Sequence, residues 1–218
     1  MSINTIESLY DKLDAEIAWR IKEMIDLKSL VLASYGQSNH DTTLRSGITL
    51  IYAHWEGFVK NALSYYLEFI AKQRLRYNVL KPCFLALTLK KKLDEFEKSS
   101  SLKSRIHNDI INTFHNLEKE ESQVPYKKQI DTKSNLNSEL FVDLMQKVGL
   151  DYSQYDIFFT MIDAELLNMR NQIAHGSRLE AISLDKESYQ RINDRIIEII
   201  EKLKDEIMDY AQDRKYMI

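Results

Sequence analysis

The stretch LRSGITLIYAHWEGFVK, residues 44–60, decides the fold. Its apolar residues recur at three- and four-residue steps, which is the period of one face of an α-helix. The apolar stripe continues beyond this stretch and comprises Leu44, Ile48, Ile51, Trp55, Val59, Leu63, Tyr66 and Ile70. The sequence therefore predicts one long amphipathic helix that begins near Asp41 or Thr42 and runs past Ile70.

Two glycines, Gly47 and Gly57, lie inside this predicted helix. Each costs roughly 1 kcal/mol relative to alanine in a helix interior, so their presence calls for a reason. Close packing of the backbone against a neighbouring helix is one such reason. A functional need for close approach to the backbone is the other.

The composition of the whole chain also favours helices. Its 218 residues include only five Gly and two Pro, whereas 29% are charged. So few turn-forming residues indicate long helices with few connections, and the length is sufficient to bury a core without disulfides or structural metals. Because no stretch resembles a linker, the sequence predicts a single all-α domain over residues 1–218, a bundle of long antiparallel helices.

Periodicity and capping signals place the other helices. The first is expected to begin at Asn4, with Glu7 completing a capping box, and to end at Gly36. Further helices are expected at residues 81–97, 102–120, 138–148, about 153–176 and about 185–210. The polar, proline-containing segment 122–135 is the best candidate for a loop.

The main irregularity of the expected bundle is a basic helical insertion at about residues 71–135. Residues 71–105 hold ten Lys/Arg and only three Asp/Glu, although the whole chain has a net charge of -3. A local basic region can contact RNA phosphates even in an acidic protein, and a solvated helix surface is the alternative. The candidate RNA-binding residues are Arg74, Arg76, Lys90, Lys91 and Lys92.

The sequence also bears on the compartment. Cys83 is the single cysteine, so neither an internal disulfide nor a cysteine-based zinc site is expected. The N-terminus lacks the apolar region of a signal peptide, and no stretch approaches the roughly 18 apolar residues of a membrane span. A soluble, cytoplasmic protein without a membrane partner is expected.

The helix that ends near Gly176 finishes in LLNMRNQIAHGSR, residues 166–178. At about 100° per residue, Asn171 and His175 lie one above the other in its last turn, and Arg170 flanks them. An arginine can hold phosphate oxygens bidentately, and a histidine that titrates near neutrality can transfer protons. These residue types suit metal-independent RNA cleavage, in which the neighbouring 2′-hydroxyl is the nucleophile.

A structural interpretation accounts for the same residues. Arg170 could form a salt bridge, for example with Glu165, and His175 could be a hydrogen-bonded residue at the helix C-terminus. One arginine and one histidine also supply only part of a cleavage site. Two copies that face each other across a symmetry axis would supply both an acid and a base.

A polar line runs along the helix of residues 41–70, beside its apolar stripe. Arg45, Thr49, Tyr52 and Glu56 follow one another at steps of four, three and four residues. We expect this line to be able to border the Arg170–His175 surface, with Arg45, Tyr52 and Glu56 as supporting residues. Glu56 could pair with Arg170 or orient His175. Ordinary boundary charges are the alternative for Arg45 and Glu56.

No cofactor or metal is expected. His54 and Glu56 do not share a helical face, and His107 and His115 lie two turns apart without an accompanying acidic triad. The sequence has no phosphate-binding glycine loop and no Ser–His–Asp arrangement.

Two segments carry a resemblance to a known family. Residues 170–176, RNQIAHG, resemble the Arg-x4-His motif of the HEPN superfamily (higher eukaryote and prokaryote nucleotide-binding domains), including the frequent Asn after the Arg. Residues 44–60 are similar to the long-helix motif of stand-alone bacterial HEPN-like nucleases, which include the RiboL-PSP-type domains.

This resemblance implies a helical bundle that is a metal-independent endoribonuclease, with Arg170, Asn171 and His175 as catalytic residues. It further implies a homodimer with a composite active site, RNA products with 2′,3′-cyclic phosphate and 5′-hydroxyl ends, and a toxin or phage-defence role under a cognate antitoxin. A catalytically inactive HEPN-type module that binds nucleotides or proteins is the alternative. Ser177 replaces a tyrosine that some HEPN toxins carry for modification by a partner nucleotidyltransferase, so that form of control is not expected.

Overall fold

The computed structural model of the protein describes residues 2–97, 108, 111–112, 114–117, 119–177 and 184–218, without the side chains of residues 91–97. The long and short α-helices are α1 (Ile6–Ala33), α2 (His40–Gln73), α3 (Pro82–Glu97), α5 (Ser138–Lys147), α6 (Asp156–Thr160), α7 (Asn168–Ala174) and α8 (Lys186–Gln212). These described ranges contain isolated β-bridges but no strand. The all-α prediction is confirmed.

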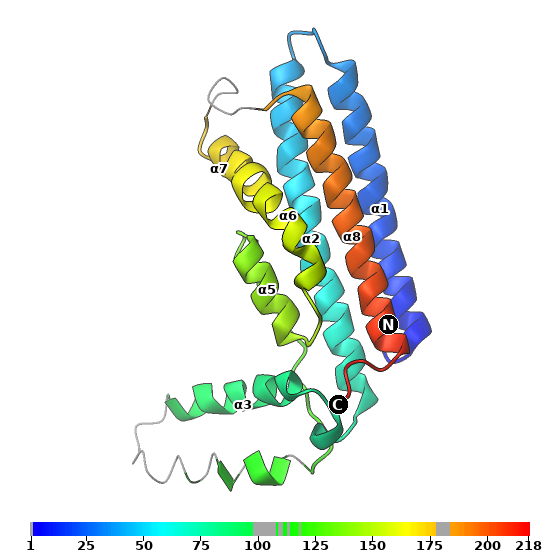
Figure 1. The fold of residues 1–218 in the computed structure, drawn as a ribbon, viewed down its shortest axis with the longest axis vertical. Coiled ribbons are helices and arrows are strands. Elements are labelled where there is room, and N and C mark those ends of the chain that lie inside the picture. Colours follow the sequence, from blue (N-terminus) through cyan, green and yellow to red (C-terminus); the bar gives the residue numbers. More distant parts are fainter. Residues whose placement is uncertain (1, 98–107, 109–110, 113, 118, 178–183) are drawn as a thin grey trace.

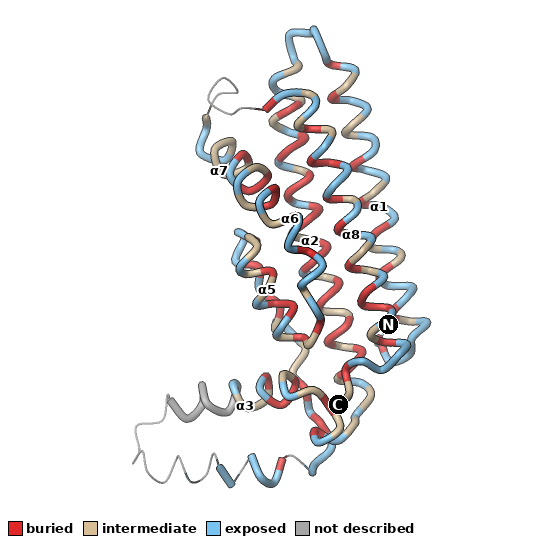
Figure 2. Tube along the Cα trace, viewed as in Figure 1, coloured by how far each residue is buried: buried red, intermediate tan, exposed pale blue. Residues whose placement is uncertain are grey.

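The bundle is built around α2. Helices α1, α2 and α8 pack against one another along most of the molecule, and α7 lies across the upper part of α2 (Figure 1). All eight residues of the apolar stripe predicted from the sequence are buried (Figure 2). Within the described ranges, none of the helices combines the length and apolar character that crossing a membrane requires.

The two glycines of α2 are explained by close packing. A Cβ at Gly47 would lie 2.5 Å from Cε2 of Tyr189 on α8, and a Cβ at Gly57 would lie 2.9 Å from Nη1 of Arg20 on α1. Both distances are shorter than real Cβ contacts, so glycine lets the neighbouring helices approach. This supports the packing interpretation of both residues.

The predicted N-terminus of the first helix was wrong by one residue. Thr5, rather than Asn4, caps α1, and its partner in the capping box is Ser8 rather than Glu7. The reciprocal bonds have the same physical basis, because a hydroxyl satisfies backbone N–H groups that the first turn leaves unpaired. At the other end, α1 stops at Ala33, before Gly36.

An arm projects from one end of the bundle and contains α3 (Figure 1). Helix α2 continues to Gln73 and ends at Arg74, whose backbone is left-handed with φ +50°. The end of α2 at Gln73 lies close to residue 71, about where the insertion is predicted to begin. The helix expected at residues 102–120 falls largely on positions outside the described residues.

The segment expected to be a loop, 122–135, contains no helix but is packed against the bundle. Val124 and Ile130 are buried, the Gln123 N–H donates to the Tyr77 hydroxyl at 2.9 Å, and Lys147 donates to the Gln129 carbonyl at 2.6 Å. This return segment carries the chain from the arm back to α5 and to the end of α7.

The helix expected at about 153–176 is present but is not uniformly α-helical. Between α6 and α7 it passes through a π-helical segment, Met161–Leu167. The buried pairs Met161/Ile162 and Leu166/Leu167 are spaced five residues apart, which matches the i→i+5 repeat of a π-helix. Such segments are frequent at functional sites.

Candidate functional site

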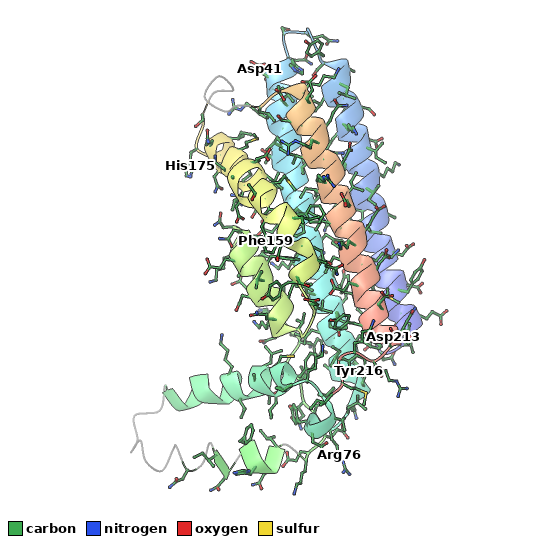
Figure 3. All side chains as sticks on the ribbon, in the orientation of Figure 1. Asp41, Arg76, Phe159, His175, Asp213 and Tyr216 are labelled. Atoms are coloured by element: carbon green, nitrogen blue, oxygen red, sulfur yellow. The ribbon has the colours of Figure 1, made fainter. Side chains whose placement is uncertain are left out.

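The candidate site lies where α7 ends. His175 terminates the helix, and Gly176 follows in the left-handed conformation with φ +84°. The Gly176 N–H donates to the Ile173 carbonyl and the Ser177 N–H to the Gln172 carbonyl, both at 3.0 Å, which closes the last turn. The His175 side chain is exposed at the edge of the molecule (Figure 3).

Arg170 is held in place from three sides. Its guanidinium lies over the ring of Tyr52, with 4.0 Å from Cζ to the ring centroid. Nη1 donates to Asn171 Oδ1 at 2.9 Å, and Nη2 donates to the Ser134 carbonyl at 2.6 Å. A guanidinium has four Nη hydrogens, and these two hydrogen bonds use only two of them.

Tyr52 is the support for this guanidinium. Its side chain is buried in the bundle, and its hydroxyl accepts a hydrogen bond from the Leu136 N–H at 2.6 Å. Burial is the main cause that raises the pKa of Tyr52, so the hydroxyl stays neutral at physiological pH. The expectation that Tyr52 supports the site agrees with this geometry.

The positive charge of Arg170 has no carboxylate partner among the described side chains. Glu165, the partner considered from sequence, instead pairs with Arg191 of α8. Glu56 forms no ion pair with Arg170 or His175 within the described ranges, so the pairing expected for it is not seen. Asn171 orients Arg170 rather than His175, since its Oδ1 accepts from the guanidinium.

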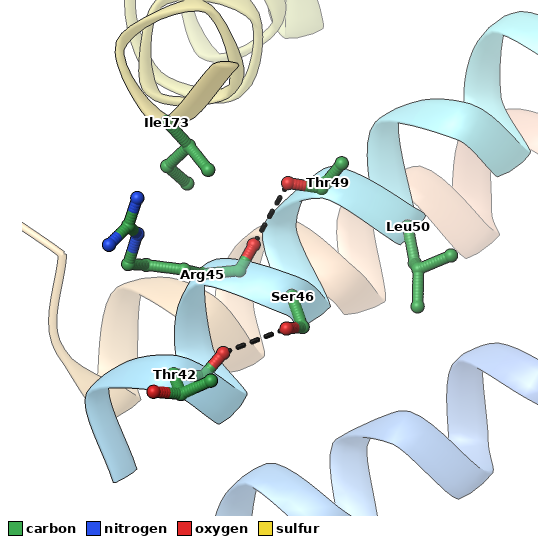
Figure 4. Close-up of a pocket in the computed structure, with 6 residues that line it drawn as sticks. All are labelled: Thr42, Arg45, Ser46, Thr49, Leu50 and Ile173. Atoms are coloured by element: carbon green, nitrogen blue, oxygen red, sulfur yellow. Dashed lines mark hydrogen bonds between the residues drawn. The ribbon is translucent and has the colours of Figure 1, made fainter. Parts of the chain in front are cut away.

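Arg45 lies on α2 two turns before Tyr52 and points toward Ile173 of α7 (Figure 4). It lines a shallow groove of about 370 Å³ across α2. The lining residues are Thr42, Arg45, Ser46, Thr49, Leu50 and Ile173. Because Ile173 lies between Arg170 and His175 in the sequence, this groove adjoins the candidate site.

The candidate RNA-binding residues are not brought to this site. Arg76 lies at the opposite end of the molecule from His175 (Figure 3), and Arg74 beside it is 3.9 Å from Glu121. Lys90 lines a separate pocket with Asp143 on α5. The side chains of Lys91 and Lys92 are outside the described residues.

Two site residues were missed from the sequence, Ser134 and Asn135. The Ser134 carbonyl accepts from Arg170, and Asn135 Oδ1 lies 3.5 Å from Asn171 Nδ2. Lys133 and Ser134 have φ of +52° and +51°, a conformation that few residues other than glycine adopt and that often marks functional segments. The polar run TKSN was visible as a loop, but helical periodicity could not connect it to Arg170.

The arrangement offers one fixed cation and one exposed imidazole at the same helix end. The cation can bind phosphate oxygens through its free N–H groups, and the imidazole can exchange protons with a bound ligand. Within the described residues, no three His, Cys, Asp or Glu side chains gather as metal ligands.

The chain is similar to a known protein family. The model of a family described as HEPN_MAE_28990-like HEPN matches residues 9–216, which include the arm as well as the bundle. No curated protein shows significant similarity to the chain, and no solved structure does.

Proposed function

Because the chain belongs to the HEPN_MAE_28990-like HEPN family, we propose that it is an endoribonuclease that cleaves RNA without a metal. The family assignment confirms the resemblance inferred from residues 44–60 and 170–176. A nuclease-type or nucleotide-binding function is typical of this domain class. The finer proposal of RNA cleavage depends on the arrangement of Arg170 and His175.

The observation that carries the proposal is a guanidinium fixed in place but not neutralised. Arg170 is positioned by Tyr52, Asn171 and Ser134 without a carboxylate among the described side chains. A cation fixed before the reaction stabilises charge that develops on a phosphate without further reorganisation. A purely structural arginine would more commonly have an acidic partner.

In the proposed reaction, the 2′-oxygen attacks the adjacent phosphorus and displaces the 5′-oxygen of the next nucleotide. His175 removes the 2′-hydroxyl proton or protonates the departing oxygen. Arg170 binds the non-bridging oxygens, and Asn171 holds Arg170. The products are a 2′,3′-cyclic phosphate and a 5′-hydroxyl.

One subunit supplies a single histidine, whereas the reaction needs an acid and a base. We therefore propose a homodimer in which two α7 ends form one composite site. The exposed position of His175 allows a second copy to approach it. Sedimentation at micromolar concentration should give a dimer, and a monomer with full activity would contradict the composite site.

The proposed cellular role is that of a toxin or phage-defence effector in the cytoplasm, restrained by a cognate antitoxin. Uncontrolled RNA cleavage would arrest growth, so such an enzyme needs a partner that controls it. Co-expression with the products of neighbouring genes would test this role, because an antitoxin should relieve growth arrest by binding the protein.

The decisive experiment is incubation of the purified protein with end-labelled RNA in EDTA. Arg170→Ala and His175→Ala should each reduce cleavage by at least about a hundredfold, as expected when a group that acts only in the transition state is lost. Matched controls are Lys12→Ala and His115→Ala, both of which remove an exposed side chain outside the candidate site. Equal cleavage by wild type and both site variants would overturn the proposal.

Binding of RNA or nucleotides without cleavage would favour the alternative, a catalytically inactive HEPN-type module. Products with a 3′-hydroxyl end would also contradict the proposed chemistry, because attack by the 2′-oxygen cannot form them.

A further inference from the structure

Among the described residues, Arg45 is the one charged residue that lines the groove across α2. Its side chain is partly buried, and it forms no ion pair with the described residues. Two of the three hydroxyls that line the groove already donate within the helix: Ser46 to the Thr42 carbonyl at 2.8 Å and Thr49 to the Arg45 carbonyl at 3.0 Å. The guanidinium is thus the main group of the groove that can bind an anion.

Arg45 of α2 and the guanidinium of Arg170, which lies over Tyr52, are on the same side of α2. Arg45 precedes Tyr52 by seven residues, or about two helical turns and roughly 10.5 Å along the axis. Because Arg170 lies over Tyr52, the two guanidinium groups lie along the same line. Ile173 of α7, three residues after Arg170, lines the groove, and its side chain lies near the Arg45 guanidinium (Figure 4).

We propose that this groove binds a nucleotide next to the one that is cut, so that Arg45 contacts a flanking phosphate of single-stranded RNA. Ile173 and the α2 surface contact the sugar or base of that nucleotide. The proposal rests on the proposed nuclease function and adds the path that the RNA strand takes across the protein. The strand runs from the end of α7 toward the N-terminal end of α2.

The chemistry of the groove favours a single strand over a duplex. An arginine fork binds a phosphate bidentately, and an apolar wall can contact an unstacked base or its sugar. The groove is shallow and only about 370 Å³ in volume, which suits a nucleotide rather than a helix of nucleic acid. A duplex would keep its bases stacked and away from Ile173.

The test is the salt dependence of binding to a short single-stranded RNA whose 2′-hydroxyls are methylated, followed by fluorescence anisotropy. Arg45→Ala should weaken binding roughly tenfold, the loss of one charge-assisted contact. It should also lower the slope of log K against log salt by about 0.7, the value for one phosphate of a single strand. Arg45→Lys should keep the slope and lose part of the affinity.

The matched control is Lys60→Ala. Lys60 is an exposed cation on the same helix, 15 residues from Arg45, or about 22 Å along the axis. Removing it changes net charge equally but should leave the affinity and the slope near wild-type values. An equal effect of Lys60→Ala and Arg45→Ala, or no effect of either, would overturn the proposal.

A cleavage assay separates this proposal from the proposed function. Arg45→Ala should raise KM much more for longer RNAs than for a dinucleotide, since a dinucleotide has no flanking phosphate. Loss of dinucleotide cleavage would contradict a flanking site. The methylated RNA lacks the 2′-hydroxyl nucleophile, so its binding is measured without cleavage. The effect of Arg45→Ala on binding can therefore be measured even if the cleavage assays with Arg170→Ala and His175→Ala reject the nuclease function.

The groove could instead face a second copy of the chain. Arg45→Ala would then change the sedimentation coefficient, while the affinity of each remaining dimer for the methylated RNA would stay the same. That outcome would assign the groove to the interface and overturn the proposal.

Discussion

Tyr52 connects the core to the candidate site through one side chain. One part of its ring packs in the bundle, and its face supports the Arg170 guanidinium at 4.0 Å. Its hydroxyl also accepts a hydrogen bond from the N–H of Leu136, the residue that directly follows the return segment, and so helps to hold that segment against the bundle. The conformation of Arg170 therefore depends on a residue that cannot touch the RNA itself.

Replacing Tyr52 should reduce cleavage without unfolding the bundle. A cation–π contact is worth about 1–2 kcal/mol when partly desolvated, so Tyr52→Leu should lower kcat/KM by about five- to thirtyfold. Tyr52→Phe keeps the aromatic face and should lose less. Steady-state kinetics measure both, and a Leu variant that is folded and fully active would show that the ring does not position Arg170.

A second prediction at the residue scale concerns His54, which is buried on α2 between Trp19 and Glu23 of α1. Burial lowers the pKa of His54 below its usual 6.5, and Glu23, 2.9 Å away, only partly opposes this. The unfolded chain then binds a proton more readily than the folded protein, so stability is lost as pH falls below about 6.5.

Urea unfolding at pH 7.5 and pH 5.5 tests this linkage. His54→Gln cannot take up the proton on unfolding, so it should lose less stability between the two pH values than wild type does. The exposed His115→Gln variant should behave like wild type. If His54→Gln and wild type lose the same stability, His54 does not control this pH dependence.

The residues of the motif were predictable because they are close in sequence. Arg170, Asn171 and His175 fall in two successive turns of one helix, and Gly176 marks where the helix ends. Ser134 was not, because it contributes a backbone carbonyl, which has no signal in the sequence. Asn135 was not, because helical periodicity does not relate a side chain in a loop to Asn171. The pairing with Arg170, one of the possibilities for Glu56, is not seen among the described residues for a related reason: a shared helical face does not fix where a long side chain points.

At the scale of elements, the π-helical segment is the feature that periodicity alone did not predict. A 3.6-residue repeat fits α2 and α8 along their length, whereas Met161–Leu167 follows a five-residue spacing. The signal was present in the pairs MI and LL, whose corresponding members are five residues apart in the sequence. A five-residue spacing does not fit the 3.6-residue repeat of an α-helix, so α-helical periodicity alone does not predict the π-helical segment.

Deletion of Ala164 should convert this segment into a regular α-helix. Ala164 is exposed, and its removal brings the two buried pairs to an i→i+4 spacing that keeps both on the core face. The protein should fold with a Tm within a few degrees of wild type. Thermal unfolding followed by circular dichroism measures this.

The matched control is deletion of Glu201, which is exposed on the regular helix α8. There a single deletion rotates the following core residues by about 100° away from the bundle, so this variant should be strongly destabilised. Equal loss of stability in both deletions would contradict the role assigned to the five-residue spacing.

In the folded molecule, His175 of the motif and Arg76 of the basic region lie at opposite ends (Figure 3). The bundle end that carries His175 lies far from the arm that carries Arg76 and the basic segment (Figure 3). The positive charge of residues 71–105 was evident from composition, but its distance from the motif depends on where α2 ends and the arm turns away. Composition gives no information on that turn.

The basic arm should therefore affect the binding of long RNAs and not the chemical step. A triple variant with Lys90, Lys91 and Lys92 replaced by alanine should cleave a short RNA at the wild-type rate. For an RNA long enough to reach both ends, the salt slope of binding should fall by up to about 2, or 0.7 for each lost phosphate contact. Slower cleavage of the short RNA would show that the arm reaches the site.

The support of Arg170 also has a consequence for protein synthesis. Ser134 precedes Arg170 by 36 residues, and Tyr52 precedes Leu136 by 84. A chain still attached to the ribosome cannot fix this guanidinium until translation has moved well past α7 and the return segment has docked. If the protein cuts RNA, its own messenger and the ribosome that makes it are spared while the nascent chain is incomplete.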